Sequence, residues 1–350
     1  MIVKTQENKT IDINGKDFAL FDACTPPFSV HGVFYENGKF RRLPESVAKE
    51  VSSGVHVLHS ITAGGRVKFR TNALSVGFVF EIEPYQLSTM PLSSASGFEI
   101  FADGKYEKTV FVSLDTKKQL DEVETMKATV HFSRKKMREI TVYFPLYCRV
   151  RKVEIGLESG SEVLPSADYA KQAPIVYYGS SITQGCCASK SSCIYPAFIE
   201  RWTHTDFWNL GFAGNCRGEE RMRDYLATLP MSVFVLDYDY NAPTPEHLLE
   251  THVEVYKAVR QTHKDIPIIM LSKPLPKRDA TSMRCYEIIK ATYEYALSQG
   301  DTNVRLIDGH TLFGKKDADV CTVDGCHPTD LGFYKMAKKV YAALRTFHRR

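Results

Sequence analysis

No stretch of the 350-residue chain is apolar for long enough to cross a lipid bilayer, which takes about 20 consecutive helical residues. The chain also lacks a basic tract that could follow a nucleic-acid backbone, because its 45 lysines and arginines are interleaved with 41 acidic residues and the net charge is only +4. Two short basic runs, at residues 134–136 and 349–350, are typical of a solvated surface. We therefore expect neither a membrane nor a nucleic acid among its partners.

Residues 1–9 contain no apolar segment and no cleavage site, so the sequence predicts no secretory signal. The nine cysteines are an odd number, and together with the missing signal they favour reduced thiols in a cytoplasmic protein. The cysteines do not show the paired C-x-x-C spacing of a structural zinc site. We expect a cytoplasmic chain without a structural metal.

The first part of the chain, residues 1–165, is rich in short segments that alternate between apolar and polar residues. Such segments occur at 55–60, 66–71, 76–82 and 139–144. Asn37-Gly38 and Asp103-Gly104 each stand between two apolar segments, and these dipeptides are common in two-residue hairpin turns. Short strands without a long helical pattern predict a β-sandwich of the jelly-roll kind over residues 1–165.

From residue 174 onward, apolar runs alternate with helical patterns. We expect strands at 175–178, 207–211, 233–237, 266–271 and 304–308. We expect helices at 194–203, with Trp202 turned inward, and at 219–229, 246–263, 283–299 and 331–347. Residues 157–173, which carry Gly160 and Pro165, are expected to form the linker. The alternation predicts an α/β domain over 174–350, a three-layer, doubly wound parallel sheet of five strands.

Polar residues follow several of these strands, at the edge where such a sheet places its site. They lie at 179–185 (Gly-Ser-Ser-Ile-Thr-Gln-Gly), 209–215, 237–241 and 324–328. A serine needs an adjacent base to act as a nucleophile, and Asp324 and His327 can place a carboxylate beside an imidazole, with Pro328 starting the last helix. Gly214 and Asn241 could supply hydrogen-bond donors to an oxyanion.

Each of these residues also has an ordinary structural explanation. A serine after a strand often caps a helix, Asp324 could cap a turn, Asn241 could be a turn residue, and Gly214 could serve only a positive φ angle. Other polar residues have a structural interpretation, in several cases beside a functional one. They are His56, His59 and His131 as strand residues, His310 in a structural role or at the rim of the site, Cys186 and Cys187 as packing groups or a catalytic thiol, Arg217, Glu219 and Glu220 as helix caps or substrate contacts, and Asp237 with Asp239 as strand-end carboxylates or a glycosidase pair.

Taken together, the four stretches resemble the sequence blocks of the SGNH (GDSL-type) hydrolases, in the order and spacing of that family. The sequence is most similar to GDSL-like acylhydrolases with an N-terminal β-sandwich, because residues 98–104 resemble a motif of that domain. The resemblance implies an SGNH, flavodoxin-like fold.

The resemblance also implies a role for each site residue. Ser181 is then the nucleophile, His327 the general base and Asp324 the residue that orients it. The backbone N–H groups of Ser181 and Gly214, with the Asn241 side chain, form the oxyanion hole. Ser180 stands where the family commonly has Asp, and Asn241 follows Asp-Tyr-Asp-Tyr rather than Gly-x-Asn-Asp.

These observations predict a serine ester hydrolase that works through an acyl-enzyme and needs no metal or organic cofactor. By analogy with the family, its substrate is a small-molecule or carbohydrate ester with a short acyl group such as acetyl. An acyltransferase with the same triad, and a non-catalytic carbohydrate-binding protein, are the alternatives. The sequence is compatible with a homo-oligomer and leaves the oligomeric state open.

Overall fold

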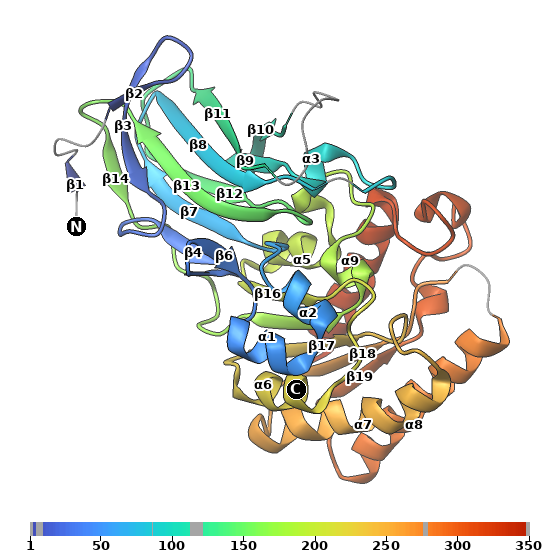
Figure 1. The fold of residues 1–350 in the computed structure, drawn as a ribbon. Coiled ribbons are helices and arrows are strands. Elements are labelled where there is room, and N and C mark those ends of the chain that lie inside the picture. Colours follow the sequence, from blue (N-terminus) through green and yellow to red (C-terminus); the bar gives the residue numbers. More distant parts are fainter. Residues whose placement is uncertain (1–2, 5–9, 86, 113–121, 276–278, 348–350) are drawn as a thin grey trace. The chain divides into compact units, whose positions relative to one another are not determined.

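The computed structural model describes residues 3–4, 10–85, 87–112, 122–275 and 279–347. It divides into two compact units, coloured by sequence in Figure 1. The β unit comprises residues 1–42, 60–169 and 189–192, and the α/β unit comprises 43–59, 170–188 and 193–350. Each unit therefore includes a segment from the other half of the chain. The predicted boundaries, 1–165 and 174–350, do not include this exchange and stay a prediction.

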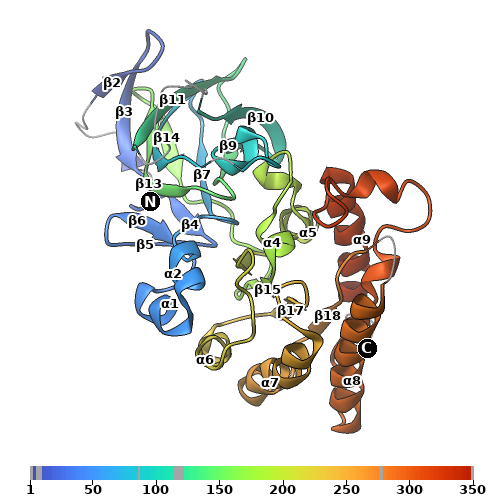
Figure 2. The same cartoon turned by 45° about the vertical axis from the view of Figure 1, so that its right-hand side comes forward.

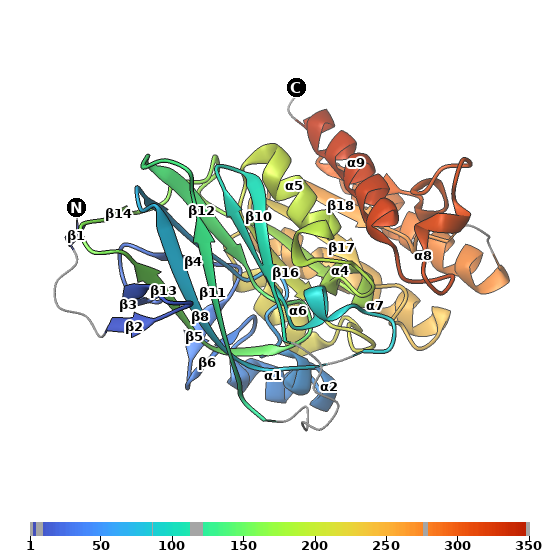
Figure 3. The same ribbon diagram turned by 90° about the horizontal axis from the view of Figure 1, so that it is seen from above.

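The β unit contains two antiparallel sheets whose strands lie far apart in the sequence. One sheet has the order β1 (Val3–Lys4), β14 (Glu162–Leu164), β7 (Arg66–Thr71), β12 (Arg138–Tyr143), β9 (Phe98–Ala102) and β10 (Lys105–Val110), with β4 (Ser29–His31) also beside β7. The other has the order β11 (Glu124–His131), β8 (Ser75–Glu83), β13 (Arg149–Leu157), β3 (Asp17–Asp22) and β2 (Thr10–Asp12). Figure 3 shows β8, β11 and β13 running alongside one another.

The larger apolar cluster of the β unit takes residues from both of its sheets. Val67 and Phe69 of β7 belong to the same buried cluster as Phe78 and Phe80 of β8. Alternate side chains of a strand point to opposite faces, so these pairs mark the inward face of each sheet. A shared core is what the predicted β-sandwich requires, and the sandwich description itself stays a prediction.

Both hairpins expected from the sequence are present. β5 (Phe34–Glu36) pairs with β6 (Lys39–Arg41) around Asn37-Gly38, and β9 pairs with β10 around Asp103-Gly104. The turn residues have positive φ angles, 49° and 77° in the first turn and 50° and 73° in the second. Such angles match a type I′ turn, which explains the preference for Asn-Gly and Asp-Gly.

Two predictions for the first half of the chain are wrong. Residues 55–60, expected as a strand, lie mostly in helix α2 (Ser53–Leu58), which follows α1 (Glu45–Val51). The Ser52 side chain caps α2 by accepting a hydrogen bond from the backbone N–H of Val55 at 3.2 Å, and Val55 is buried in the core of the α/β unit. The expected linker at 157–173 contains strand β14, which pairs with β7 and β1.

The α/β unit is built on a parallel sheet. Its order is β16 (Phe207–Gly211), β15 (Ile175–Gly179), β17 (Val233–Asp237), β18 (Ile268–Leu271) and β19 (Val304–Ile307), so all five expected strands are confirmed. The strands are near-continuous apolar runs, as is typical of parallel sheets. The sheet order is that of flavodoxin-like folds, in which sites lie beyond the carboxyl ends of the strands.

Helices α6 (Glu220–Thr228), α7 (Pro245–Thr262) and α8 (Ala280–Ser298) contribute to one apolar core with the sheet, and Figure 2 shows α7 beside α8. Helix α5 (Tyr195–Thr203) contacts α9 (Asp330–Phe347), as Figure 3 shows. The five helices expected here are confirmed, and the three-layer description stays a prediction. The expected inward position of Trp202 is wrong. Its side chain is 36% exposed and contacts the rings of Phe198, Tyr334 and Tyr341 at the α5–α9 contact.

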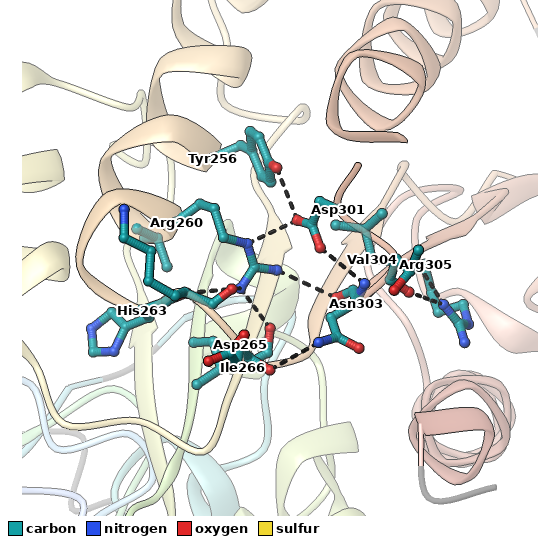
Figure 4. A network of polar contacts seen from close by, with 12 residues as sticks. Tyr256, Arg260, His263, Asp265, Ile266, Asp301, Asn303, Val304 and Arg305 are labelled. Atoms are coloured by element: carbon teal, nitrogen blue, oxygen red, sulfur yellow. Dashed lines mark hydrogen bonds and ion pairs between the residues drawn. The ribbon is translucent and has the colours of Figure 1, made fainter. Parts of the chain in front are cut away.

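A polar network fixes the connections that lead into β18 and β19 (Figure 4). Arg260 on α7 donates to Asp301 Oδ2 at 2.8 Å and to the carbonyl oxygens of His263 and Ile266, each at 2.8 Å. Asp301 also accepts from the hydroxyl of Tyr256 at 2.9 Å and from the backbone N–H of Asn303 at 2.9 Å. These bonds hold the amino ends of the two strands, opposite the edge where the polar residues gather.

The exchanged segment 189–192 satisfies a buried carboxylate of the β unit. Glu99 of β9 is fully buried, and its carboxylate accepts from the backbone N–H of Ser192 at 2.6 Å and from its hydroxyl at 3.1 Å. Lys190 lies 3.4 Å from the same carboxylate. A buried charge is costly unless it is paired and hydrogen-bonded, so this segment of the chain stabilises the first sheet of the β unit.

Candidate functional site

The two serines after β15 have different positions and different contacts. The Ser180 hydroxyl accepts a hydrogen bond from the backbone N–H of Ile182 at 3.2 Å and caps the short helix α4 (Ser181–Gln184). The Ser181 hydroxyl instead lies 2.8 Å from Nε2 of His327, 146 residues further along the chain. A side chain does not fit at Gly179, because a Cβ there would lie 2.1 Å from Thr183 Oγ1 and 2.6 Å from the carbonyl oxygen of Asp237. Glycine at this position therefore makes the close packing of the turn possible.

His327 and Asp324 lie on one turn, which brings the imidazole ring next to the carboxylate. Nδ1 of His327 lies 2.7 Å from Asp324 Oδ2, and Asp324 Oδ1 accepts from the backbone N–H groups of Cys326 at 3.0 Å and His327 at 2.8 Å. The backbone N–H of Val323 donates to the carbonyl oxygen of His327 at 2.9 Å and closes the turn. The helix begins at Asp330 rather than at Pro328, so the expectation that Pro328 starts it is wrong.

Hydrogen bonds shift the pKa values of both Asp324 and His327. Partial burial raises the pKa of Asp324, but hydrogen bonds from the His327 ring and from two backbone N–H groups outweigh it and hold the pKa below its usual value. The side-chain hydrogen bond with Cys326 raises the pKa of His327, burial opposes it, and the bond with Asp324 adds to the rise, to about 9. These hydrogen bonds therefore stabilise the imidazolium once the neutral ring has accepted a proton.

Gly214 and Asn241 lie on neighbouring loops after β16 and β17. Gly214 has a φ of 71°, which favours glycine, and is exposed. Asn241 Oδ1 accepts from the backbone N–H of Cys216 at 3.3 Å. The oxygen of this amide therefore faces Cys216, and its NH2 group points away from Cys216. The structure thus joins the loops of these two residues to each other, and it joins Ser181, His327 and Asp324 in a separate hydrogen-bonded chain.

Two polar residues that the sequence did not single out connect the segment leading to Gly214 with the turn that carries Ser181. Gln184 Oε1 accepts from the backbone N–H of Ala213 at 3.0 Å. The Asn209 amide donates to the carbonyl oxygen of Thr183 at 2.7 Å and accepts from the backbone N–H of Gly211 at 2.9 Å. Both lie inside the stretches noted in the sequence, and their full burial, invisible there, is what marks them.

Asp237 and Asp239 are buried carboxyl groups, 2% and 3% exposed. Asp237 Oδ2 lies 3.0 Å from the hydroxyl of Thr183 and 3.2 Å from that of Tyr195. Burial, followed by the charge of Asp239, raises the pKa of Asp237 to about 8. Burial likewise raises the pKa of Asp239 to about 6. Two groups enclosed in this way do not support the glycosidase alternative, which needs carboxylates on either side of a substrate.

Asp237→Asn is expected to become more favourable for stability as the pH rises. The unfolded Asp237 ionises near pH 4 while the folded one keeps its proton to about pH 8, so the parent loses stability between these values, on the order of a few kcal/mol. Asparagine cannot ionise and avoids that loss. The Tm of both proteins, measured at pH 5 and pH 8, should show the variant gaining on the parent at pH 8. A difference that moves the other way would contradict the buried, protonated Asp237.

The remaining candidates have structural contacts. His56 and His59 lie on or just after α2 rather than on a strand, which corrects the prediction. His131 ends β11 with Nδ1 2.8 Å from Ser75 Oγ, and His310 Nδ1 lies 3.1 Å from the carbonyl oxygen of Leu275. Arg217 donates to the carbonyl oxygen of Gly214 at 3.3 Å. Glu219 precedes α6 without a side-chain cap bond, and Glu220 begins that helix.

The sequence was also compared with known families. Residues 172–345 match the GDSL-like Lipase/Acylhydrolase family, and residues 19–163 match a family described as the N-terminus of Esterase_SGNH_hydro-type. The chain belongs to the GDSL-like lipase/acylhydrolase family. The family resemblance noted from the sequence is thereby confirmed for both halves of the chain. No curated protein matches the sequence.

Several solved structures share the fold of this GDSL-like chain. A protein described as a GDSL-like lipase from Bacteroides ovatus is 26% identical with a TM-score of 0.81, and the match covers 93% of this chain and 97% of that one. The salicylyl-acyltransferase SsfX3 from a tetracycline biosynthetic pathway is 19% identical with a TM-score of 0.76, covering 94% and 97%. An acetyl xylan esterase from the rumen bacterium Butyrivibrio proteoclasticus is 10% identical with a TM-score of 0.62, covering 94% and 98%.

The two family matches indicate an esterase or acylhydrolase of the SGNH type. The two more distant structures share the fold alone. Within the described part of the chain, no helix is both long and apolar enough to cross a membrane.

Proposed function

We propose that this chain is a serine esterase that removes short acyl groups, acetyl above all, from a carbohydrate or small metabolite. The observation that carries the proposal is the hydrogen-bonded chain Ser181–His327–Asp324, with contacts of 2.8 and 2.7 Å. A nucleophile within hydrogen-bond reach of a base, itself oriented by a third group, is the geometry of serine hydrolases on unrelated folds.

The reaction follows from this chain of contacts. Ser181 Oγ attacks the acyl carbonyl carbon while its proton passes to Nε2 of His327. The imidazolium then gives that proton to the departing alcohol oxygen as the carbon–oxygen bond breaks, leaving the acyl group on Ser181. Water, deprotonated by His327, attacks the acyl carbon, and the proton returns to Ser181 as the acid leaves. Asp324 holds the ring and stabilises the charged form that it takes during these steps.

The oxyanion of each tetrahedral intermediate is assigned to the backbone N–H groups of Ser181 and Gly214 and to the Asn241 side chain. Donors fixed in advance are needed because reorganising them during the reaction would raise the barrier. Three observations support the assignment: Gln184 anchors Ala213, Cys216 holds Asn241 Oδ1, and Gly214 is exposed.

Gly54→Ala tests the position of the loop that carries Gly214. A Cβ at Gly54 on α2 would lie 1.8 Å from Asn215 Oδ1, so Asn215 must move, although it is now held by a 2.8 Å bond from its amide to the carbonyl oxygen of Ala213. We expect kcat for a short-chain aryl ester to fall about tenfold, since small displacements of catalytic groups are costly. Ser53→Ala, at an exposed position of the same helix, is the control and should leave kcat within about twofold.

Because alanine is the better helix former, a lower kcat in Gly54→Ala cannot be attributed to a weakened α2. Equal kcat values for Gly54→Ala and Ser53→Ala would show that the position of Asn215 does not affect the loop of Gly214.

The short acyl group is proposed by analogy with the acetyl xylan esterase that shares the fold. Transfer of the acyl group to an alcohol or amine is the second candidate, favoured by the similarity to the salicylyl-acyltransferase. Both use the same acyl-enzyme and differ in the group that intercepts it. Acid release measured with and without added sugar alcohols or amines separates them, because a transferase yields a new ester or amide at the expense of free acid.

Labelling by a fluorophosphonate tests the proposal as a whole. The reagent should attach rapidly to Ser181, as located by mass spectrometry of the digested protein, because it reacts with activated serines. A panel of acetyl, butyryl and longer aryl esters, followed by acetylated sugars, should show the highest kcat/KM for acetyl. Absence of labelling would overturn the proposed activity and favour a non-catalytic carbohydrate-binding protein.

A further inference from the structure

Two cysteine thiols lie beside the proposed general base. Cys186 and Cys187 follow Gly185, the residue that ends α4, and their sulfur atoms are 3.7 Å apart. One ring nitrogen of His327 lies within 4.8 Å of both sulfur atoms. The two cysteines are each 6% exposed, whereas the His327 side chain is 23% exposed. The thiols are therefore buried, and solvent reaches the group from the side of the histidine.

These spacings match the ligand polyhedron of a soft divalent cation. Tetrahedral zinc binds sulfur at about 2.3 Å and imidazole nitrogen at about 2.0–2.1 Å, which places sulfur atoms about 3.8 Å apart and sulfur and nitrogen about 3.6 Å apart. The observed sulfur–sulfur distance of 3.7 Å already equals such an edge. The histidine needs a movement of at most about 1 Å to complete three corners.

The backbone fixes the two thiols in this arrangement. Cys187 has a φ of 71°, a left-handed conformation that is rare outside glycine and costs about 1–2 kcal/mol. The backbone N–H of Cys186 donates to the carbonyl oxygen of Ser181 at 2.9 Å, and that of Ala188 donates to Gly185 at 3.2 Å. Hydrogen bonds therefore hold the backbone turn that carries the two thiols before any ligand arrives, and a preformed site binds more tightly than one that must be ordered.

Asp324 completes the surroundings that such a site needs. A histidine that binds zinc with one ring nitrogen usually donates its other N–H to a carboxylate or carbonyl oxygen, and Nδ1 of His327 lies 2.7 Å from Asp324. The nitrogen left for a metal is Nε2, the atom that contacts Ser181. A metal bound to Nε2 would prevent that atom from accepting the hydroxyl proton of Ser181.

We propose that Cys186, Cys187 and His327 form a binding site for Zn²⁺, and that zinc inhibits the hydrolase by occupying Nε2 of His327. The fourth corner of the tetrahedron is left to water. Binding depends only on the three ligands, whereas inhibition rests on the function proposed for Ser181. The site differs from the paired C-x-x-C type that the spacing of the cysteines excludes, because here adjacent cysteines join a histidine 140 residues away in the sequence.

A second group, Asp324, Cys326 and His327, also has its ligand atoms within 4.8 Å of one another. We favour the first group because Asp324 already accepts three hydrogen bonds, which a metal on that carboxylate would disrupt. The first group also supplies two thiolates, which zinc prefers to a carboxylate with a single thiolate.

Cobalt binding tests the site without reference to activity. Reduced, metal-free full-length protein titrated with Co²⁺ should show thiolate-to-cobalt charge-transfer absorption in the near ultraviolet, which one equivalent of Zn²⁺ abolishes. Cys186→Ser and Cys187→Ser should each raise the Kd for cobalt by at least about tenfold. Cys193→Ser, six residues from Cys187 and outside both groups, is the matched control and should bind like the parent. The Ser181→Ala protein should also bind cobalt.

Activity tests the second half of the proposal. Micromolar Zn²⁺ should inhibit ester hydrolysis reversibly, with recovery on adding EDTA, and the half-inhibitory concentration should rise at least about tenfold in Cys186→Ser and Cys187→Ser, each compared with its own zinc-free rate. Parent-like cobalt binding in both variants, or loss of binding only in Cys326→Ser, would overturn the site. Binding without inhibition would overturn its effect on catalysis. A protein that binds cobalt but hydrolyses no ester would refute the proposed function and leave the site standing.

Discussion

Ser181→Ala is expected to lower kcat/KM for an aryl acetate by about a thousandfold or more, because the remaining groups can only polarise the ester and not form the acyl-enzyme. The fold should survive, since the Ser181 hydroxyl contacts His327 at 2.8 Å while the helix cap is supplied by Ser180. Steady-state kinetics with p-nitrophenyl acetate, together with the Tm of the variant, measure both effects. Labelling by a fluorophosphonate should disappear.

Ser180→Ala is the matched control for this experiment. It removes the cap on α4, which is typically worth about 1 kcal/mol, and leaves the Ser181 hydroxyl in place. We expect it to lower the Tm while it keeps most of the activity, the reverse of Ser181→Ala. If the two variants exchanged these phenotypes, the nucleophile would be Ser180. If neither lost activity, the serine mechanism would fail.

Asp324→Asn is expected to lower kcat/KM by about 10³–10⁴-fold while it leaves the turn folded. Asp324 Oδ1 accepts two backbone N–H groups, and the amide oxygen of asparagine can take over that role. The amide nitrogen must then face Nδ1 of His327, and because it is a donor it forces the ring proton onto Nε2. A protonated Nε2 in a neutral ring cannot accept the proton of Ser181.

The control for this variant is Asp308→Asn, which changes another carboxylate whose Oδ1 accepts a backbone N–H, here from His310 at 3.0 Å. It should keep kcat/KM within about threefold of the parent. Slow labelling of Ser181 by the fluorophosphonate in Asp324→Asn, with an unchanged Tm, would support the tautomer argument. Parent-like kinetics would show that Asp324 only closes the turn.

The sequence predicted the parts of the fold that depend on local patterns. The apolar runs of β15 and β17 are long and uninterrupted, and both hairpins follow from dipeptides that favour positive φ angles. The prediction failed where tertiary contacts decide. Residues 55–60 alternate as a strand would, but α2 is too short to show a helical period and is fixed by its cap and by burial of Val55.

The sequence predicted which residues belong to the site, but not the contacts that hold their loops in place. Ser181, Asp324 and His327 stand in recognisable stretches, and the structure joins them in one hydrogen-bonded chain. The neighbouring loop depends on a hydrogen bond from Ala213 to Gln184 and on the absence of a side chain at Gly54 beside Asn215, and these pairs are 29 and 161 residues apart. No local pattern in a single sequence reveals such pairings.

The exchange of segments between the two units determines how the protein can be shortened. A fragment that begins at residue 170 would contain Ser181, Asp324 and His327, yet it would lack α1 and α2, whose Val47, Ala48 and Val55 share the apolar core with Met222 and Leu226. It would also leave Ser192 without the carboxylate of Glu99. Such a fragment would expose an apolar face and aggregate, so the residues from 170 onward cannot be produced as a separate stable domain.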